Sequence, residues 1–174
     1  MTEYMANAPI TREWLEWYGD AWRAYEEYIK QKETLEKRIN GLSAVRYDTL
    51  KVSKGNGATY SEEEHYVLRL EKIDRAIRDC ESILIPAKER LKQQISRIHK
   101  SEYRKVLILR YIERWKWIDI INECFWYEED LNYNFEKYKT KVMYWNRAAL
   151  ERLEELSSIA YIPAERQITI GLEQ

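Results

Sequence analysis

The residues best suited to binding chemistry in this chain of 174 residues are Lys and Arg side chains that gather in its last third. Residues 100–116 hold six bases and two acids, and residues 137–152 hold five bases and one acid. Each stretch therefore has a net charge of +4, whereas the whole chain has a net charge of −1. A histone-like polycation is excluded, but either stretch could engage phosphate groups locally.

The second basic stretch also carries four side chains that a helix would turn away from its apolar stripe: Thr140, Lys141, Tyr144 and Arg147. Cations contact phosphates and guanine edges, while Tyr and Thr add hydrogen bonds and methyl contacts. This is the chemistry of a helix that reads the DNA major groove. A solvated basic face is the plainer interpretation, and composition leaves both open.

Between the basic stretches lies an acidic and aromatic sequence, Phe125, Trp126, Tyr127, Glu128, Glu129 and Asp130. Exposed aromatic side chains in an acidic frame can anchor a protein interface or mimic nucleic acid. The alternative is that these rings fill the core. The same two interpretations apply to the N-terminal cluster of Trp14, Trp17, Tyr18, Trp22 and Tyr25, and for Trp14 to Trp22 we favour packing at the junction between the hairpin and the C-terminal helices.

The sequence offers no set of residues that would support catalysis or metal binding. The thiols are Cys80 and Cys124, the imidazoles are His65 and His99, and no H-E-x-x-H spacing exists. The consecutive acids Glu128, Glu129 and Asp130 would not converge on a divalent ion without further ligands. We therefore predict no enzymatic activity, no metal site and no cofactor.

The rest of the composition is typical of a soluble helical protein of the cytoplasm. Five Gly and three Pro favour long helices. No apolar run approaches the length of a membrane span, so no membrane association is expected. Acids and aromatics near the start are not typical of a signal peptide.

Two long helices with heptad patterns are expected first. Residues 11–44, with Thr11 as N-cap, repeat Trp14, Ala21, Tyr28, Leu35 and Leu42. After a loop over residues 45–60 with a Lys54-Gly55-Asn56-Gly57 turn, Ser61 and Glu64 open a second helix as a capping box. Its heptad series is Leu70, Ile77, Leu84, Leu91 and Ile98. Pro86 should kink or divide this helix without changing the heptad phase.

Together these helices predict a long antiparallel hairpin, whose seam is filled either within the chain or by a second copy in a homodimer. Three shorter helices should follow at 102–112, 115–125 and 137–157, with residues 126–136 as a loop. The fold class is therefore all-α. Its parts are a hairpin at 1–99, a three-helix domain at 100–158 and a tail at 159–174. The inward residues of the shorter helices include Val106, Leu107, Ile118, Ile121, Phe125, Val142, Ala149 and Leu153.

The C-terminal part resembles region four of sigma factors. The resemblance rests on three segments: Val106-Leu107-Ile108-Leu109-Arg110-Tyr111-Ile112, Trp117-Ile118-Asp119-Ile120-Ile121 and Ala148-Ala149-Leu150-Glu151-Arg152-Leu153. With the long hairpin ahead of them, the chain is similar to the RinA- and ArpU-type late-transcription regulators of phages. These place a helical half before a sigma-like helix-turn-helix. The resemblance covers residues 30–156 loosely and 103–153 more closely, and its motifs are short and mostly hydrophobic.

The resemblance implies a phage-encoded regulator that binds double-stranded DNA in the bacterial cytoplasm, with host RNA polymerase as a further partner. It assigns base contacts to Lys141, Tyr144 and Arg147, with Thr140 beside them. It assigns phosphate contacts to Arg114, Lys116, Lys137 and Lys139.

The chain departs from that family between the last two helices. The family has a short turn there, whereas Phe125 to Glu136 is long, acidic and aromatic. An acidic insertion beside a reading helix would repel phosphate unless it folds away from the groove. The alternative function is therefore a phage protein-binding module that inhibits or redirects a host protein, a polymerase or a defence nuclease, through this surface.

Overall fold

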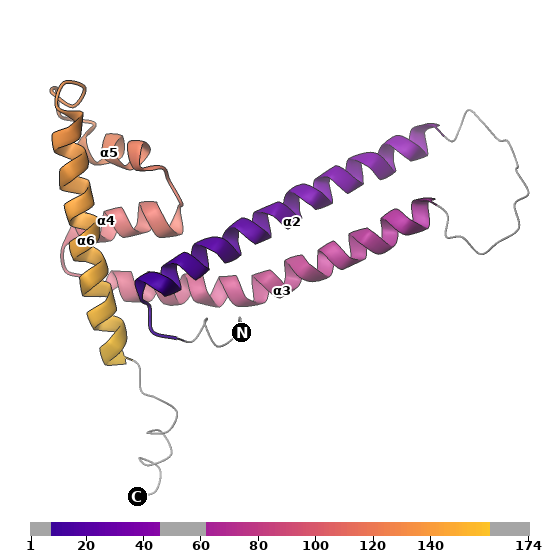
Figure 1. The fold of residues 1–174 in the computed structure, drawn as a ribbon, viewed down its shortest axis with the longest axis horizontal. Helices are drawn as coiled ribbons and strands as arrows, with labels where there is room; N and C mark the ends of the chain where they lie inside the picture. The colour runs from indigo at the N-terminus through magenta and orange to yellow at the C-terminus, as the bar shows by residue number, and fades with distance from the viewer. Residues whose placement is uncertain (1–7, 46–61, 161–174) are drawn as a thin grey trace, which may run out of the picture. The chain divides into compact units, whose positions relative to one another are not determined.

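A computed structural model describes residues 8–45 and 62–160 of the chain. They form five α-helices and one π-helical turn, with no strand among the described residues (Figure 1): α2 Arg12–Val45, α3 Glu62–Ser96, α4 Ser101–Leu107, η2 Ile108–Ile112, α5 Trp117–Phe125 and α6 Phe135–Ala160. The all-α class predicted from the sequence is confirmed. The Lys54–Gly57 turn, the Ser61 cap and most of the predicted tail lie outside the described residues.

Helix α2 begins where the sequence predicted, at the Thr11 cap. The Trp14 N–H donates to Thr11 Oγ1 at 3.2 Å, and the Leu15 N–H donates to the Thr11 carbonyl at 3.0 Å. The residues ahead of the helix are tied to α6, because the Ile10 N–H donates to Ser157 Oγ at 2.6 Å. Donors at this helix end are therefore satisfied by side chains rather than by the helix itself.

Helix α3 continues through Pro86 as one helix. The prediction that this proline could divide the helix is therefore wrong. A proline removes the hydrogen bond that would reach the carbonyl of Ser82, four residues earlier. Ser82, Ile85 and Pro86 are all exposed, so water can reach that carbonyl. The helix therefore tolerates the proline because it lies on the solvated face, while Leu84 and Leu91 remain buried on the other.

The chain divides into two compact units by its internal contacts. The middle unit is Asp20–Leu84, and the C-terminal unit is Met1–Gly19 with Ile85–Gln174.

The middle unit has a small core made by one segment of α2 and one of α3. Leu35, Ile73 and Ile77 are its buried residues. Tyr25 donates to Glu81 Oε1 at 2.8 Å, and Lys32 Nζ pairs with Asp74 Oδ1 at 2.8 Å. Because the later residue on α2 meets the earlier residue on α3, the two segments of this unit pair in antiparallel order.

The core of the C-terminal unit is built from α4, α5 and α6, and both shorter helices pack against α6 (Figure 1). Its buried residues are Val106, Ile120, Ile121, Cys124, Phe125, Tyr138 and Val142. In the same unit Trp14 and Tyr18 are buried and stacked, with ring centroids 5.3 Å apart. The expectation that these two N-terminal aromatics are core residues is confirmed.

Two details of the C-terminal helices differ from the sequence prediction. The helix expected at 102–112 ends as a π-helical turn, in which the Glu113 N–H donates to the Ile108 carbonyl at 2.9 Å. Ile118, expected inward, is 54% exposed, while Ile120 is fully buried. The buried residues of α5 are Ile120, Ile121, Cys124 and Phe125, and on a 3.6-residue helix Ile118 lies at the edge of this arc, in the first turn.

Candidate nucleic-acid interface

The side chains proposed to read DNA come together on one exposed face of α6. The buried stripe of this helix contains Tyr138, Val142, Ala149 and Leu153. The exposed side chains are spaced three and four residues apart, so neighbouring turns place them side by side: Lys137, Thr140, Lys141, Tyr144 and Arg147. Tyr144 is 63% exposed although it is a large aromatic residue. We call this set the α6 basic face.

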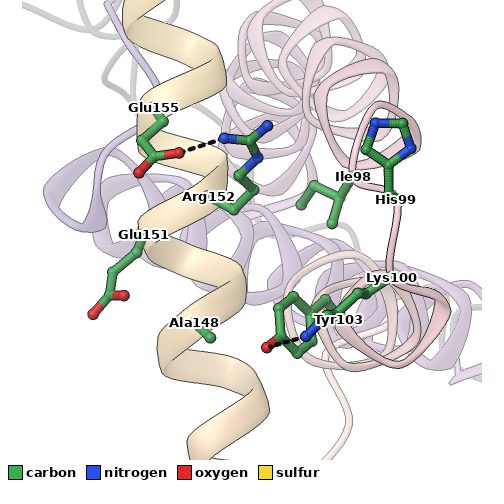
Figure 2. Close-up of a pocket in the computed structure, with 8 residues that line it drawn as sticks. All are labelled: Ile98, His99, Lys100, Tyr103, Ala148, Glu151, Arg152 and Glu155. Carbon is green, nitrogen blue, oxygen red and sulfur yellow. Dashed lines mark hydrogen bonds and ion pairs between the residues drawn. The ribbon is translucent and has the colours of Figure 1, made fainter.

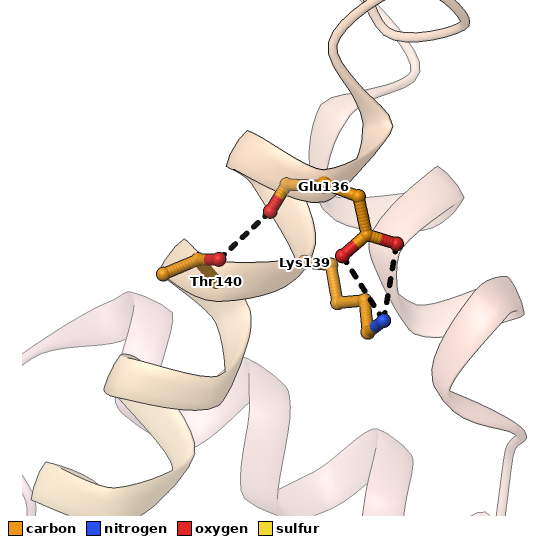
Figure 3. Close-up of polar contacts among 3 residues, drawn as sticks. All are labelled: Glu136, Lys139 and Thr140. Carbon is orange, nitrogen blue, oxygen red and sulfur yellow. Dashed lines mark hydrogen bonds and ion pairs between the residues drawn. The ribbon is translucent and has the colours of Figure 1, made fainter.

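Figure 3 shows how Glu136 engages two neighbours at the start of this face. Thr140 Oγ1 donates to the Glu136 carbonyl at 2.8 Å, so its hydroxyl proton is used by the helix backbone. Lys139 Nζ lies 3.1 Å from each carboxylate oxygen of Glu136. That ion pair is between exposed side chains and contributes little, so Lys139 can exchange it for a phosphate.

Both lysines of the α6 basic face lie over aromatic rings. Lys141 Nζ is 5.1 Å from the centroid of the Phe125 ring and 5.3 Å from that of Trp145. Lys137 Nζ is 4.8 Å from the Tyr138 ring and 3.7 Å from Asp130 Oδ2. Cation–π contacts hold both ammonium groups close to the helix surface. Contact with a base edge would therefore require Lys141 to swing away from its rings.

Arg114 and Lys116, the two cations assigned to phosphate ahead of α5, lie within and directly after an unusual turn. Arg114 is half-buried and has φ 62°, in the left-handed region. The Trp115 N–H donates to the Leu109 carbonyl, six residues back, at 2.9 Å and so closes the end of the π-helical turn. Arg110 Nη1 donates to the Trp115 carbonyl at 2.9 Å and so fixes the turn. Because no glycine stands at this position, the turn could not be predicted from the sequence.

The acidic and aromatic segment divides into buried and exposed rings. The prediction that Phe125 belongs to the exposed surface is wrong, because this residue is fully buried. It ends α5, and its ring stacks on that of Trp145 with centroids 5.4 Å apart. It is therefore not available to a partner. Trp126 and Tyr127 are 75% and 60% exposed. Glu129 is exposed, and Glu128 and Asp130 are half-buried.

Asp130 links this segment to α6, a contact that sequence reasoning missed. The Tyr138 hydroxyl donates to Asp130 Oδ1, and Asn134 Nδ2 donates to Asp130 Oδ2 at 2.8 Å. These hydrogen bonds lower the pKa of Asp130, and the same contact raises the pKa of Tyr138 to about 12. A turn separates Asp130 from Tyr138, and no helical or strand periodicity relates two residues on either side of a turn. This contact therefore could not be predicted from the sequence.

A cavity of about 260 Å³ lies on another side of α6 (Figure 2). Ile98, His99 and Lys100 line it from the connection between α3 and α4, opposite Arg152 and its neighbours on α6. Arg152 Nη1 is paired with Glu155 Oε2 at 2.6 Å. Acids and bases are mixed around this cavity, so its charge selects neither an anion nor a cation.

Within residues 8–45 and 62–160, His, Cys, Asp and Glu nowhere gather as a group of three that could hold a metal ion. In the same part of the chain, the helices lack the length and apolar character needed to span a membrane. The chain matches no family model, no curated protein and no solved structure.

Proposed function

We propose that this protein binds duplex DNA through the α6 basic face and acts as a transcriptional regulator. The observation that carries the proposal is the exposure of Lys137, Lys141, Tyr144 and Arg147 along one face of one helix. In this proposal α6 lies in the major groove, where Lys141, Tyr144 and Arg147 meet base edges. Arg114, Lys116, Lys137 and Lys139 contact the flanking phosphates.

The dimensions of the basic face suit this task. From Lys137 to Arg147 the helix rises about 15 Å, which matches roughly four base-pair steps of about 3.4 Å each. The only acid within residues 135–150 is Glu136, and its carboxylate is paired with Lys139. A face of this length and charge can track the groove without meeting a carboxylate in its centre.

Part of the negative charge in the acidic segment ahead of α6 is balanced by neighbouring residues. Asp130 accepts hydrogen bonds from Tyr138 and Asn134 and lies 3.7 Å from Lys137 Nζ. Its negative charge is therefore balanced locally at the start of α6. Glu128 and Glu129 remain as the carboxylates that would repel a phosphate within about 10 Å at ordinary salt.

The same proposal covers the rest of the chain and its biological setting. A helical hairpin precedes a sigma-like helix-turn-helix, the hairpin seam supports a homodimer, and the site of action is transcription in a bacterial host of a phage. Polymerase contact would follow from that role. A dimeric regulator would recognise two half-sites about one helical turn apart.

The test is selection of a target sequence from random duplex DNA, followed by affinity measurements on three variants. Lys141→Ala and Arg147→Ala should each cost about 1–3 kcal/mol on the selected sequence and relax the preference at one position. Lys137→Ala should weaken all sequences alike and reduce the salt dependence. Unchanged affinity in all three variants would exclude α6 as the reading helix.

A further inference from the structure

Trp126 and Tyr127 form an aromatic pair that the core does not use. The two rings meet edge to face, with centroids 6.0 Å apart and an interplanar angle of 88°. Both are mostly exposed, whereas the preceding residue Phe125 is fully buried. Adjacent exposed aromatic rings mark interaction surfaces more often than scattered apolar residues do. We call residues 126–134, which carry this pair, the aromatic knuckle.

The knuckle is held firmly by the helices on either side. Phe125 and Phe135, at its two ends, and Leu131, within it, pack in the core of the C-terminal unit. The Glu128 N–H donates to the Phe125 carbonyl at 2.9 Å, and the Asn134 N–H donates to the Asp130 carbonyl at 2.9 Å. The exposed rings therefore stand on a hydrogen-bonded support, which reduces the ordering cost of binding a partner.

Charge decides which class of partner this surface fits. Glu128, Glu129 and Asp130 follow the aromatic pair, and residues 126–134 contain no Lys or Arg. A nucleic-acid phosphate placed on the rings would lie within the screening length of these carboxylates and be repelled. A guanidinium group gains twice, because it stacks on an aromatic face and pairs with a carboxylate.

We propose that the aromatic knuckle binds an arginine-rich segment of another polypeptide, with Trp126 and Tyr127 as stacking platforms and Glu129 as the exposed carboxylate. This surface is separate from the α6 basic face, which fits an anion. The inference does not depend on the proposed DNA binding, and either could fail without the other.

The test measures by fluorescence anisotropy how tightly the protein binds three labelled probes: an arginine nonapeptide, a lysine nonapeptide and single-stranded oligothymidine. The variant Trp126→Ala with Tyr127→Ala removes both rings without changing the charge of the protein. Tyr144→Ala is the matched control, because Tyr144 is equally exposed but lies on the α6 basic face. Circular dichroism and thermal melting confirm that each variant folds, and Glu129→Gln provides a second variant at an exposed position.

The expected result is that the double variant binds the arginine peptide about tenfold more weakly, while Tyr144→Ala leaves it unchanged. The unaltered protein should also prefer arginine to lysine peptide, and the double variant should lose that preference. Equal arginine-peptide affinity in the unaltered protein and the double variant would overturn the proposal. So would a loss confined to oligothymidine, which would make the rings a stacking surface for bases.

Discussion

The hydroxyl of Tyr138, on the buried side of α6, donates a hydrogen bond to the carboxylate of Asp130 in the segment ahead of that helix. Asn134 donates to the same carboxylate at 2.8 Å, and Lys137 lies 3.7 Å from it. The aromatic knuckle and the α6 basic face therefore share one anchor. Its hydrogen bonds fix where the acidic segment ends and where the basic face begins.

This anchor predicts a specific dependence of stability on pH. The pKa of Tyr138 is raised to about 12, so its contribution is complete below about pH 10 and lost as pH rises through 12. The pKa of Asp130 is lowered, so its contribution is present above about pH 4 and lost as pH falls through the lowered value. Tyr138→Phe removes the hydroxyl and keeps the ring.

We therefore expect Tyr138→Phe to be less stable than the unaltered protein near neutral pH, with the gap shrinking above about pH 10. Urea unfolding of both proteins across this range measures the gap directly. Because the other tyrosines are common to both proteins, their titration cancels in the comparison. A gap of constant size up to pH 12 would mean that the hydroxyl makes no hydrogen bond to Asp130.

The left-handed residue Arg114 predicts a stabilising substitution. Its φ of 62° costs a residue with a Cβ atom about 1–2 kcal/mol, and glycine avoids most of that cost. We expect Arg114→Gly to unfold with a free energy about 1 kcal/mol higher than Arg114→Ala, which loses the same side chain but keeps the Cβ. Chemical denaturation of both variants gives this difference.

The same pair of variants separates structure from binding. If Arg114 contacts a phosphate, glycine and alanine should weaken DNA binding equally although their stabilities differ. A glycine variant no more stable than the alanine variant would remove the argument for strain at this turn.

Removing the hydroxyl of Ser157 should lower stability more than the small size of this residue suggests. It is buried, and its Oγ accepts the Ile10 N–H at 2.6 Å. Ser157→Ala leaves that backbone donor without a partner and should lower the free energy of unfolding by about 1–3 kcal/mol. Ser158 is exposed and donates only to the Glu154 carbonyl, so Ser158→Ala is the matched control and should change little. Equal effects at both positions would contradict the tie between the residues before α2 and α6.

The helices themselves could be predicted from the sequence because their signals are local. The Thr11 cap and the heptad residues Leu84, Leu91 and Ile98 are found as expected. The exposure of the α6 basic face followed from the same reasoning, since it lies opposite an apolar stripe whose period is visible in the sequence.

What could not be predicted depends on contacts between distant segments or on backbone geometry. Phe125 and Trp126 are adjacent aromatics, and only the end of α5 decides that the first is buried and the second exposed. The turn at Arg114 uses a residue with no preference for positive φ. The hydrogen bond from Tyr138 to Asp130 joins residues eight apart across a turn, and no regular spacing reveals it.

The most direct test of DNA binding is the affinity of the protein for random duplex DNA at two salt concentrations. Four phosphate contacts predict that affinity falls about 100-fold between roughly 50 and 200 mM salt. Lys139→Ala should reduce the slope of log K against log salt by about 0.9. Lys92→Ala is the matched control, because Lys92 pairs with Glu89 in the same helical spacing as Lys139 with Glu136. Binding that weakens steeply with salt, with Lys139→Ala alone altering the slope, is the predicted result. No binding at low salt would contradict the α6 basic face as a DNA-binding surface, and the same slope in both variants would contradict the proposed phosphate contact of Lys139.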